Sequence, residues 1–274
     1  MLASNTALDT RTAAVSVRCL GTFSLLINGR PVQRWRAGKT RAFFQLLLVN
    51  RGRVVLKDRL EEVLWPGMDS SASVSLRVAV HALRRILDAP PDALAAPVRI
   101  TFQDIGYVLE AEDIWVDVEE FGGLCARAEA ALRRGDQGAA VETYAAAVEL
   151  YAGDFLPHDD SDWVQEYRQW NRSHMLQALR VLQADAFARR DNAAVGRWCQ
   201  RALDVDPYHE QTYQMLMSLH AQRGERGQVR RWYELCERRL HELAVVPDQT
   251  TKILYTRAMA PQAALTPMRQ RSSP

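Results

Sequence analysis

Apolar residues recur at helical spacing along nearly the whole stretch from Phe121 to Met259. Only glycines, prolines and short acidic turns interrupt this spacing, and no segment of the stretch alternates apolar and polar residues as a strand does. A helical pattern of this length limits the C-terminal half of the chain to an all-α fold.

Three turn-and-helix segments of this half align with one another: Gly135-Asp136 leading to Ala147, Asp191-Asn192 leading to Ala202, and Gly224-Glu225 leading to Cys236. From Ala202 to Cys236 the offset is 34 residues, the period of tetratricopeptide helix pairs, in which a small side chain lets neighbouring helices approach closely. We therefore predict helical repeats, whose stacked pairs form a concave surface suited to peptide or protein partners.

The first interval, from Ala147 to Ala202, is 55 residues and so predicts an insertion. We place an acidic loop at 154–163, followed by a helix that carries Trp163, Tyr167 and Trp170 on adjacent turns. We expect these aromatic side chains to lie in the core rather than to form a cage for a ligand.

The N-terminal half has a different pattern. Residues 15–27 alternate apolar and other side chains, and Asn28-Gly29 follows, a dipeptide that tolerates the positive φ angles of a tight turn. We predict a strand, this turn and a short second strand.

Helical spacing then predicts three helices. The first begins near Lys39 and stops at 50–52, the second covers 56–64 and is closed by Pro66, and the third runs from about Ser71 to Leu87. The third helix buries Leu76, Val80, Leu83 and Leu87, and turns Ser71, Val74, Val78, His81 and Arg85 to the opposite side, with Arg77 and Arg84 on one flank.

A hairpin completes this half, because Val98, Ile100 and Phe102 alternate before a turn at 103–106, and Tyr107 and Leu109 resume the apolar face. A small sheet, three helices and a hairpin in this order are typical of a winged helix-turn-helix, whose third helix enters the major groove of DNA. The predicted fold class is mainly α: an α+β winged helix with a small antiparallel sheet and wing hairpin, then an all-α tetratricopeptide-like domain.

The two halves carry opposite charge. Residues 1–105 contain 15 Lys and Arg against 8 Asp and Glu, whereas residues 106–274 contain 20 against 25. A basic first half indicates a polyanionic partner. Val74 and Val78 on the outward face favour DNA, because an apolar side chain can contact the methyl group of thymine. The alternative is that the third helix packs in a bundle and its arginines are solvated.

Other function classes find little support. Gly38-Lys39-Thr40 resembles the end of a phosphate-binding loop, but Gln33 stands where the first glycine belongs. We see no nucleophile elbow, cofactor loop or paired-carboxylate pattern, and predict neither an enzyme nor a cofactor. Four scattered cysteines indicate buried thiols rather than a metal site or disulfides. No run approaches the roughly 18 apolar residues of a membrane span, so we expect a cytoplasmic protein.

Several motifs stand in a characteristic order: Gly38-Lys39-Thr40-Arg41-Ala42, Leu60 with Leu64-Trp65-Pro66, Leu83-Arg84-Arg85-Ile86-Leu87, Gly106-Tyr107, Val116-Asp117-Val118 with Phe121, and Tyr151-Ala152-Gly153-Asp154-Phe155-Leu156 with Trp163. With them, the chain from Val15 to Met259 resembles the family of Streptomyces antibiotic regulatory proteins. Members of that family join an OmpR-type winged helix to a bacterial transcriptional activation domain of tetratricopeptide repeats.

The resemblance implies DNA binding at promoters by paired subunits on direct repeats, and activation through contacts with RNA polymerase and its sigma factor. The base-reading positions that it implies are Ser73, Val74, Arg77, Val78 and His81, and the phosphate-binding positions are Lys39, Arg41, Arg84, Arg85 and Arg99. Val74 and Val108 depart from the family's pattern, in which a polar and a basic residue, respectively, are usual.

We divide the chain into a disordered tail (1–14), a winged helix-turn-helix DNA-binding domain (15–112), a bacterial transcriptional activation domain (113–260) and a second disordered tail (261–274). The leading hypothesis is a sequence-specific regulator, an activator that binds promoter direct repeats through helix 71–87 and recruits RNA polymerase. The alternative is a protein-interaction scaffold whose winged helix no longer binds DNA, and the salt dependence of duplex affinity distinguishes the two.

Overall fold

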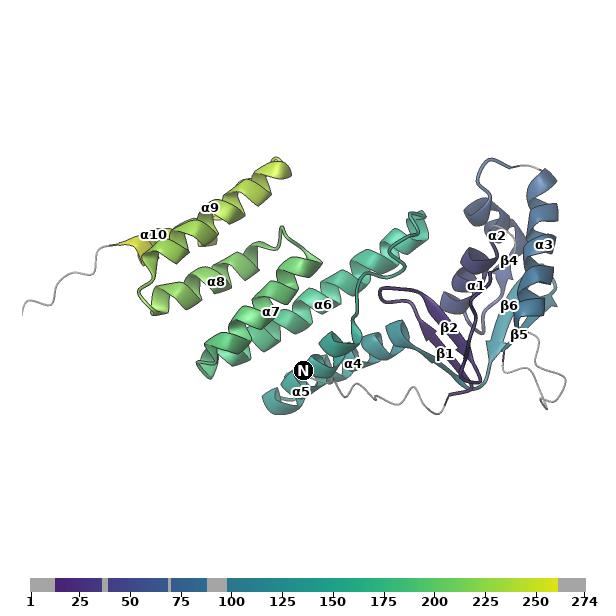
Figure 1. The fold of residues 1–274 in the computed structure, drawn as a ribbon, viewed down its shortest axis with the longest axis horizontal. Coiled ribbons are helices and arrows are strands. Elements are labelled where there is room, and N and C mark those ends of the chain that lie inside the picture. The colour runs from purple at the N-terminus through teal and green to yellow at the C-terminus, as the bar shows by residue number, and fades with distance from the viewer. Residues whose placement is uncertain (1–12, 36–38, 69, 88–97, 261–274) are drawn as a thin grey trace, which may run out of the picture. The chain divides into compact units, whose positions relative to one another are not determined.

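The computed structural model describes residues 13–35, 39–68, 70–87 and 98–260, so residues 1–12 of the first predicted tail and the whole of the second, 261–274, lie outside the described residues. The chain forms two compact units, residues 1–174 and 175–274. The predicted order of a small sheet, three helices, a hairpin and then helices alone is confirmed (Figure 1).

The first sheet has the strand order β3-β2-β1-β7, with β1 at Val15–Arg18, β2 at Ser24–Ile27, β3 at Arg30–Pro31 and β7 at Ile114–Val116. Strands β1 and β2 pair antiparallel, with Val15 opposite Ile27. The prediction of one strand over 15–27 is therefore wrong: Gly21, with a φ of 88°, lies in a turn that folds the segment back on itself. The turn at Asn28-Gly29 is confirmed.

Strand β7 was not predicted, and it lies parallel to β1 with Val15 opposite Ile114. Three residues are too few to show an alternating pattern in the sequence. The pairing brings the start of the helical half to the sheet of the N-terminal half.

Three helices follow the first sheet: α1 at Thr40–Val49, α2 at Lys57–Leu64 and α3 at Ser70–Leu87. Their apolar stripes meet in one core whose largest fully buried side chains include Phe43, Leu47 and Leu60. The predicted inner stripe of α3 is confirmed, because Leu76, Val80, Leu83 and Leu87 are all buried.

A second sheet has the order β4-β6-β5, with β4 at Val55–Leu56, β5 at Val98–Gln103 and β6 at Gly106–Ala111. Strands β5 and β6 form the predicted hairpin, with Gln103 opposite Gly106. The short strand β4, between α1 and α2, was not predicted. It attaches the hairpin to the helices.

The remaining helices are α4 at Asp117–Arg133, α5 at Gln137–Leu150, α6 at Asp162–Ala188, α7 at Asn192–Val205, α8 at Glu210–Gln222, α9 at Arg226–Glu242 and α10 at Gln249–Met259. The three aligned small residues, Ala147, Ala202 and Cys236, lie on α5, α7 and α9 and are buried. Helix α6 runs through the boundary between the two units.

The turns that join α4 to α5, α6 to α7 and α8 to α9 have the same backbone. In each, a residue with positive φ (Gly135, Arg190 or Gly224) ends the first helix. The amide of the next residue then donates a hydrogen bond to a carbonyl five positions earlier, at 2.9–3.0 Å. Two acidic caps begin the second helices, because Asp136 and Asp191 each accept a hydrogen bond from the amide three residues later. The structure thus repeats a helix pair, as the aligned segments predict.

The segment 151–161 between α5 and α6 packs against the turn that joins β1 to β2. The amide of Leu156 donates to the carbonyl of Cys19, and the amide of Gly21 donates to that of Asp154, both at 2.9 Å. A Cβ atom on Gly153 would lie 3.2 Å from the Gly21 Cα atom, so this close approach favours a glycine.

Asp117, at the start of α4, adds a buried link to the same turn. Its carboxylate accepts hydrogen bonds from the amides of Cys19 and Leu20 at 2.7 and 2.9 Å. Burial raises the pKa of Asp117, although these hydrogen bonds oppose the rise. The first unit therefore contains the winged helix together with α4, α5 and the beginning of α6.

The expectation for the three aromatic residues of α6 holds only in part. Trp163 is buried, but Tyr167 is 37% exposed and Trp170 is 49% exposed. Tyr167 stacks on Phe155 with 5.3 Å between ring centroids, and Trp170 lies 3.9 Å from the ring of His174. All three side chains share one face of α6, and only Trp163, in the first turn of the helix, is buried.

All four cysteines are buried free thiols, as predicted. Burial raises the pKa of Cys125, Cys199 and Cys236 to about 12. None of the helices in the described ranges has the length and apolar character that crossing a bilayer requires.

Candidate nucleic-acid interface

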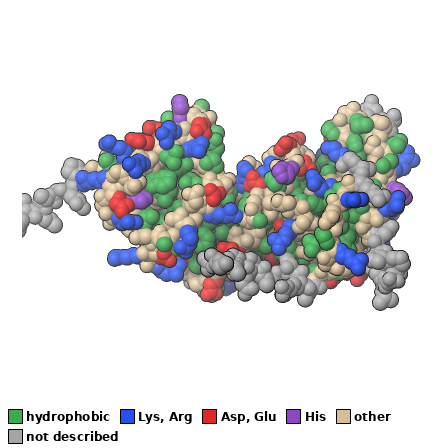
Figure 2. Space-filling model, viewed as in Figure 1, with side chains coloured by type: hydrophobic (Ala, Val, Ile, Leu, Met, Phe, Trp, Pro, Cys, Tyr) green, Lys and Arg blue, Asp and Glu red, His purple; other side chains and the backbone are tan. Residues whose placement is uncertain are grey.

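Helix α3 has one buried and one open face. Leu76 and Leu83 are fully buried, whereas Val74 and Val78, one turn apart on the other side, are 53% and 52% exposed. A valine side chain forms no hydrogen bonds with water. Two exposed valines on one helix face therefore form an apolar surface suited to contact with another molecule. On the face shown in Figure 2, Lys, Arg and His side chains border the edge of the molecule that α3 forms.

The N-terminal end of α3 is fastened to α2. The Ser73 hydroxyl donates to the Glu61 carboxylate at 2.7 Å, and the same carboxylate oxygen lies 3.4 Å from the ammonium group of Lys57. Ser73 is therefore a link between the two helices, and only its oxygen lone pairs remain for a base. The contribution of Glu61 was not predicted, because its position relative to Ser73 depends on the crossing of the two helices.

The C-terminal part of α3 is fastened to the hairpin. Arg84 donates from Nε and Nη2 to the carbonyl of Ile100, at 3.2 and 3.0 Å. The side chain predicted as a phosphate contact thus holds β5 against α3. This bond could not be anticipated from helical periodicity, which places a residue on a face but does not give its partner.

The other predicted positions on α3 remain open. His81 and Arg85 are exposed, and Arg77 is exposed with its Nε atom 3.3 Å from the carbonyl of Ser73, one turn earlier. Together with Val74 and Val78 they give the outer face an apolar centre flanked by basic groups.

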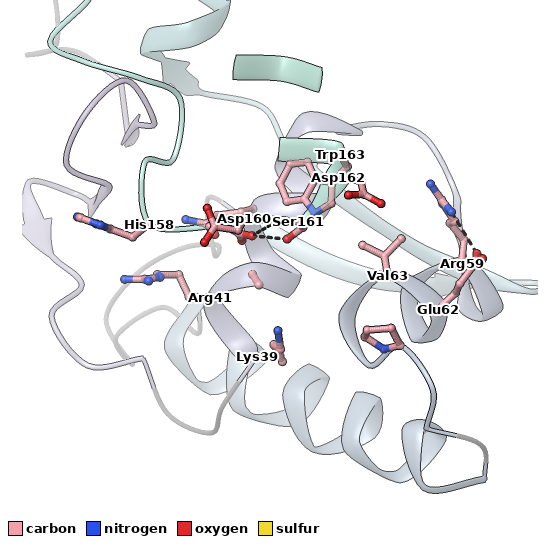
Figure 3. A pocket seen from close by; sticks show the side chains of 14 residues that line it. Lys39, Arg41, Arg59, Glu62, Val63, His158, Asp160, Ser161, Asp162 and Trp163 are labelled. Atoms are coloured by element: carbon pink, nitrogen blue, oxygen red, sulfur yellow. Dashed lines mark hydrogen bonds and ion pairs between the residues drawn. The ribbon is translucent and has the colours of Figure 1, made fainter. Parts of the chain in front are cut away.

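The three remaining phosphate candidates lie on other elements. Arg99 is exposed on β5, directly opposite Glu110 of β6. Lys39 and Arg41 are exposed at the start of α1, where they line an open pocket of about 770 Å³ with residues of α2 and of the segment before α6 (Figure 3).

The tip of the hairpin is apolar. Phe102 is 51% exposed and Ile105 is 66% exposed, and the neighbouring strand β4 leaves Leu56 uncovered. Asp104 is the only charged residue of the two-residue turn. The tip of the wing therefore offers hydrophobic contact rather than a cation to whatever it meets.

Two family models match the chain in order. The first, described as "Transcriptional regulatory protein, C terminal", matches residues 36–109, which contain the three helices and most of the hairpin. The second, described as "Bacterial transcriptional activator domain", matches residues 116–258, more than half of the chain. The chain belongs to the bacterial transcriptional activator domain family. The regulator thus has the module order of the antibiotic regulatory proteins, and the predicted resemblance is confirmed.

The structure of the regulator is similar to that of EmbR from Mycobacterium tuberculosis, solved in complex with a low-affinity phosphopeptide. The TM-score is 0.70 at 22% identity, over 90% of this chain, which confirms the predicted fold. The regulator spans 65% of the EmbR chain, less than two thirds of its length.

A second similar structure is the C-terminal, TPR-containing domain of a Plasmodium falciparum FK506-binding protein. It aligns over 52% of this chain and 87% of its own, with 8% identity and a TM-score of 0.39. None of the curated protein sequences compared with the regulator matches it.

Proposed function

We propose that this transcription regulator is a sequence-specific DNA-binding activator whose helix α3 reads bases in the major groove of promoter DNA. The observation that carries the proposal is the state of α3: both ends are fastened to the rest of the first unit, while the face with Val74 and Val78 stays open. A reading element has to be rigid, because side chains must meet base edges at fixed positions.

Within this proposal, Arg77 and His81 supply polar contacts to bases and the two valines supply contacts to methyl groups. Arg85, Arg99, Lys39 and Arg41 are the candidates for phosphate contacts, which fix the register on the duplex. Because Ser73 and Arg84 are bonded within the protein, they act first as supports for α3.

The second module fits the activating part of the proposal. Matches to the activator domain family and the repeated helix pairs support a surface for protein partners, for which we propose RNA polymerase and its sigma factor. Two copies of the chain on adjacent direct repeats complete the proposal, and a protein with this task acts on the nucleoid in the cytoplasm.

The test is a titration of the full chain with promoter fragments at several salt concentrations. We expect the logarithm of affinity to fall linearly with the logarithm of salt, with a slope of about −0.9 per neutralised phosphate. Arg77→Ala should relax the preference at one base pair, whereas Arg85→Ala should weaken binding to all duplexes alike. Absence of any duplex affinity in dilute buffer would refute the proposal.

The scaffold hypothesis retains one specific observation in its favour, the apolar tip of the hairpin at Phe102 and Ile105. Such a tip suits a protein surface as well as it suits the wall of a groove. A scaffold would show no salt-dependent duplex affinity, so the same titration decides between the two functions.

A further inference from the structure

An acidic loop faces the basic start of α1 inside the first unit. The pocket of about 770 Å³ is lined by Lys39 and Arg41 on one side and by Asp160 and Asp162 on another, with α2 completing the wall. Figure 3 shows the side chains of Lys39, Arg41, Asp160 and Asp162 around this pocket. The acidic loop comprises residues 157–161 together with Asp162, the first residue of α6.

The cations of Lys39 and Arg41 and the carboxylates of Asp160 and Asp162 line the same pocket, but they do not neutralise one another. In the described part of the chain, none of Lys39, Arg41, Asp160 and Asp162 forms an ion pair within 4.0 Å. The other charged groups of the wall have local partners: Arg59 pairs with Glu62 on α2 at 3.1 Å, and Asp159 accepts from the Ser161 amide at 3.0 Å and from the Ser161 hydroxyl.

The acidic loop is held in place from behind. Arg168 of α6 is buried, and its guanidinium donates to the carbonyls of Phe155, Leu156 and Asp159 at 3.2, 2.8 and 2.9 Å. A guanidinium that bonds three carbonyls of one segment fixes the path of that segment. The backbone that leads to Asp160 and Asp162 is therefore held in place.

We propose that the acidic loop is a built-in electrostatic brake on DNA binding. The brake rests on the proposed function, in which Lys39 and Arg41 contact DNA phosphates. A phosphate that approaches these two cations also approaches Asp160 and Asp162, and the repulsion between like charges offsets part of the attraction. The loop belongs to the activator-domain match and the cations to the winged-helix match, so the second module lowers the affinity of the first.

The test compares duplex affinity of the full chain before and after neutralising the loop. Asp160→Asn changes one exposed side chain, and the double variant D160N/D162N removes both charges without a change of shape. At low salt we expect D160N to bind any duplex roughly twofold to threefold more tightly, and the double variant roughly threefold to tenfold. The gain should shrink as salt rises, because the groups face water.

The matched control is Glu142→Gln with Glu149→Gln, which removes two exposed carboxylates of α5 in the same unit. An equal gain in this control would show an effect of net charge alone and would overturn the brake. In a background of Lys39→Met and Arg41→Met, the gain from D160N/D162N should disappear.

The outcomes separate the brake from the function on which it rests. Affinity that is present in the unchanged protein but unaffected by D160N/D162N overturns the brake and leaves DNA binding intact. If neither protein binds a duplex in dilute buffer, the DNA-binding proposal fails and the brake fails with it.

Discussion

Asp154 and Arg172 form an ion pair in the first unit with two hydrogen bonds. The Nε atom of Arg172 lies 2.8 Å from Oδ1, its Nη2 atom bonds the second oxygen, and the Tyr151 hydroxyl donates to Oδ1 at 3.1 Å. Burial alone would raise the pKa of Asp154, but the hydrogen bonds and charge of Arg172, together with Tyr151, outweigh it and lower the pKa.

This lowered pKa predicts a stability contribution that depends on pH. The contribution is complete above the usual aspartate pKa of about 3.9 and is lost as pH falls through the lowered value in the folded protein. We expect Arg172→Met to reduce the free energy of unfolding by about 1 kcal/mol at pH 7, because the pair is partly exposed. The difference from the unchanged protein should shrink as pH falls below the usual aspartate pKa and vanish once pH is below the lowered pKa of Asp154.

Denaturant titrations at pH 7, 4.5 and 3 would measure this difference. Arg133→Met is the matched control, because Arg133 lies 3.9 Å from Glu129 on an exposed helix face. The control should stay within about 0.5 kcal/mol at every pH. A pH-independent loss in Arg172→Met would indicate lost packing rather than lost charge.

Individual side chains also show which contacts can be predicted from the sequence and which cannot. The periodicity of α3 predicted correctly which residues are buried and that Val74, Val78 and His81 face outward. It did not anticipate the bonds of Ser73 and Arg84, because Glu61 and Ile100 come from other elements whose approach depends on the tertiary fold.

At the scale of elements, the two open valines of α3 give a specific expectation about the DNA. Four residues of helix rise about 6 Å, close to two base steps of about 3.4 Å, so both valines can meet thymine methyl groups of one half-site. Replacing a contacted thymine by deoxyuridine removes only that methyl group. We expect a roughly threefold to fivefold loss of affinity, as burying one methyl group contributes about 0.8 kcal/mol.

The Val78→Ala variant should lose a similar amount on the thymine duplex and become insensitive to deoxyuridine. Val245→Ala, an exposed valine of the second unit, serves as the control and should leave both affinities unchanged. A uracil effect that persists undiminished in both Val74→Ala and Val78→Ala would show that other side chains contact the methyl groups.

The repeated turns within the helix pairs give a prediction about stability. Replacing arginine by glycine in such a turn and replacing glycine by alanine should have opposite effects on the free energy of unfolding. Arg190 has a φ of 57° where Gly135 and Gly224 have 79° and 72°. A side chain costs about 1 kcal/mol in this region. Arg190→Gly should therefore raise the free energy of unfolding by up to about 1 kcal/mol, and Gly135→Ala or Gly224→Ala should lower it by about as much.

Gly196 provides the control for these turns, because it lies within α7 and a Cβ atom there would meet nothing within 4 Å. Gly196→Ala should stabilise the protein, since alanine favours a helix by about 1 kcal/mol over glycine. A loss of stability in Arg190→Gly would show that the arginine side chain makes a contact worth more than the strain.

Whole helices were easier to predict than short strands. Helices α1 to α3 repeat an apolar stripe over two to five turns, whereas β4 has two residues and β7 has three. Such short strands form because a neighbouring strand is available for pairing. Their own residues therefore do not predict them from the sequence.

For the molecule as a whole, the position of the domain boundary has a direct consequence. The sequence places a boundary at 112, and this remains a prediction, but the compact first unit extends to residue 174. Ending the chain at 112 removes β7 from the edge of β1, the Asp117 carboxylate from two amides, and the segment that bonds Cys19 and Gly21.

We therefore expect a fragment of residues 13–174 to melt cooperatively, and a fragment of residues 13–112 to melt at least about 10 °C lower or to lack a cooperative transition. Circular dichroism during heating would measure both. Equal melting temperatures would show that the winged helix is self-sufficient and that these contacts add nothing to its stability.

The pairing of β1 with β7, and of Cys19 with Leu156, also has a consequence during synthesis. Strand β2 follows β1 at once, but the other neighbour of β1, strand β7 at Ile114–Val116, leaves the ribosome only roughly 100 residues after Arg18, so the sheet stays unfinished over that interval. A messenger truncated anywhere in that interval yields a chain without a completed sheet. Such a chain would leave the edge of β1 open to pairing with a strand of another chain.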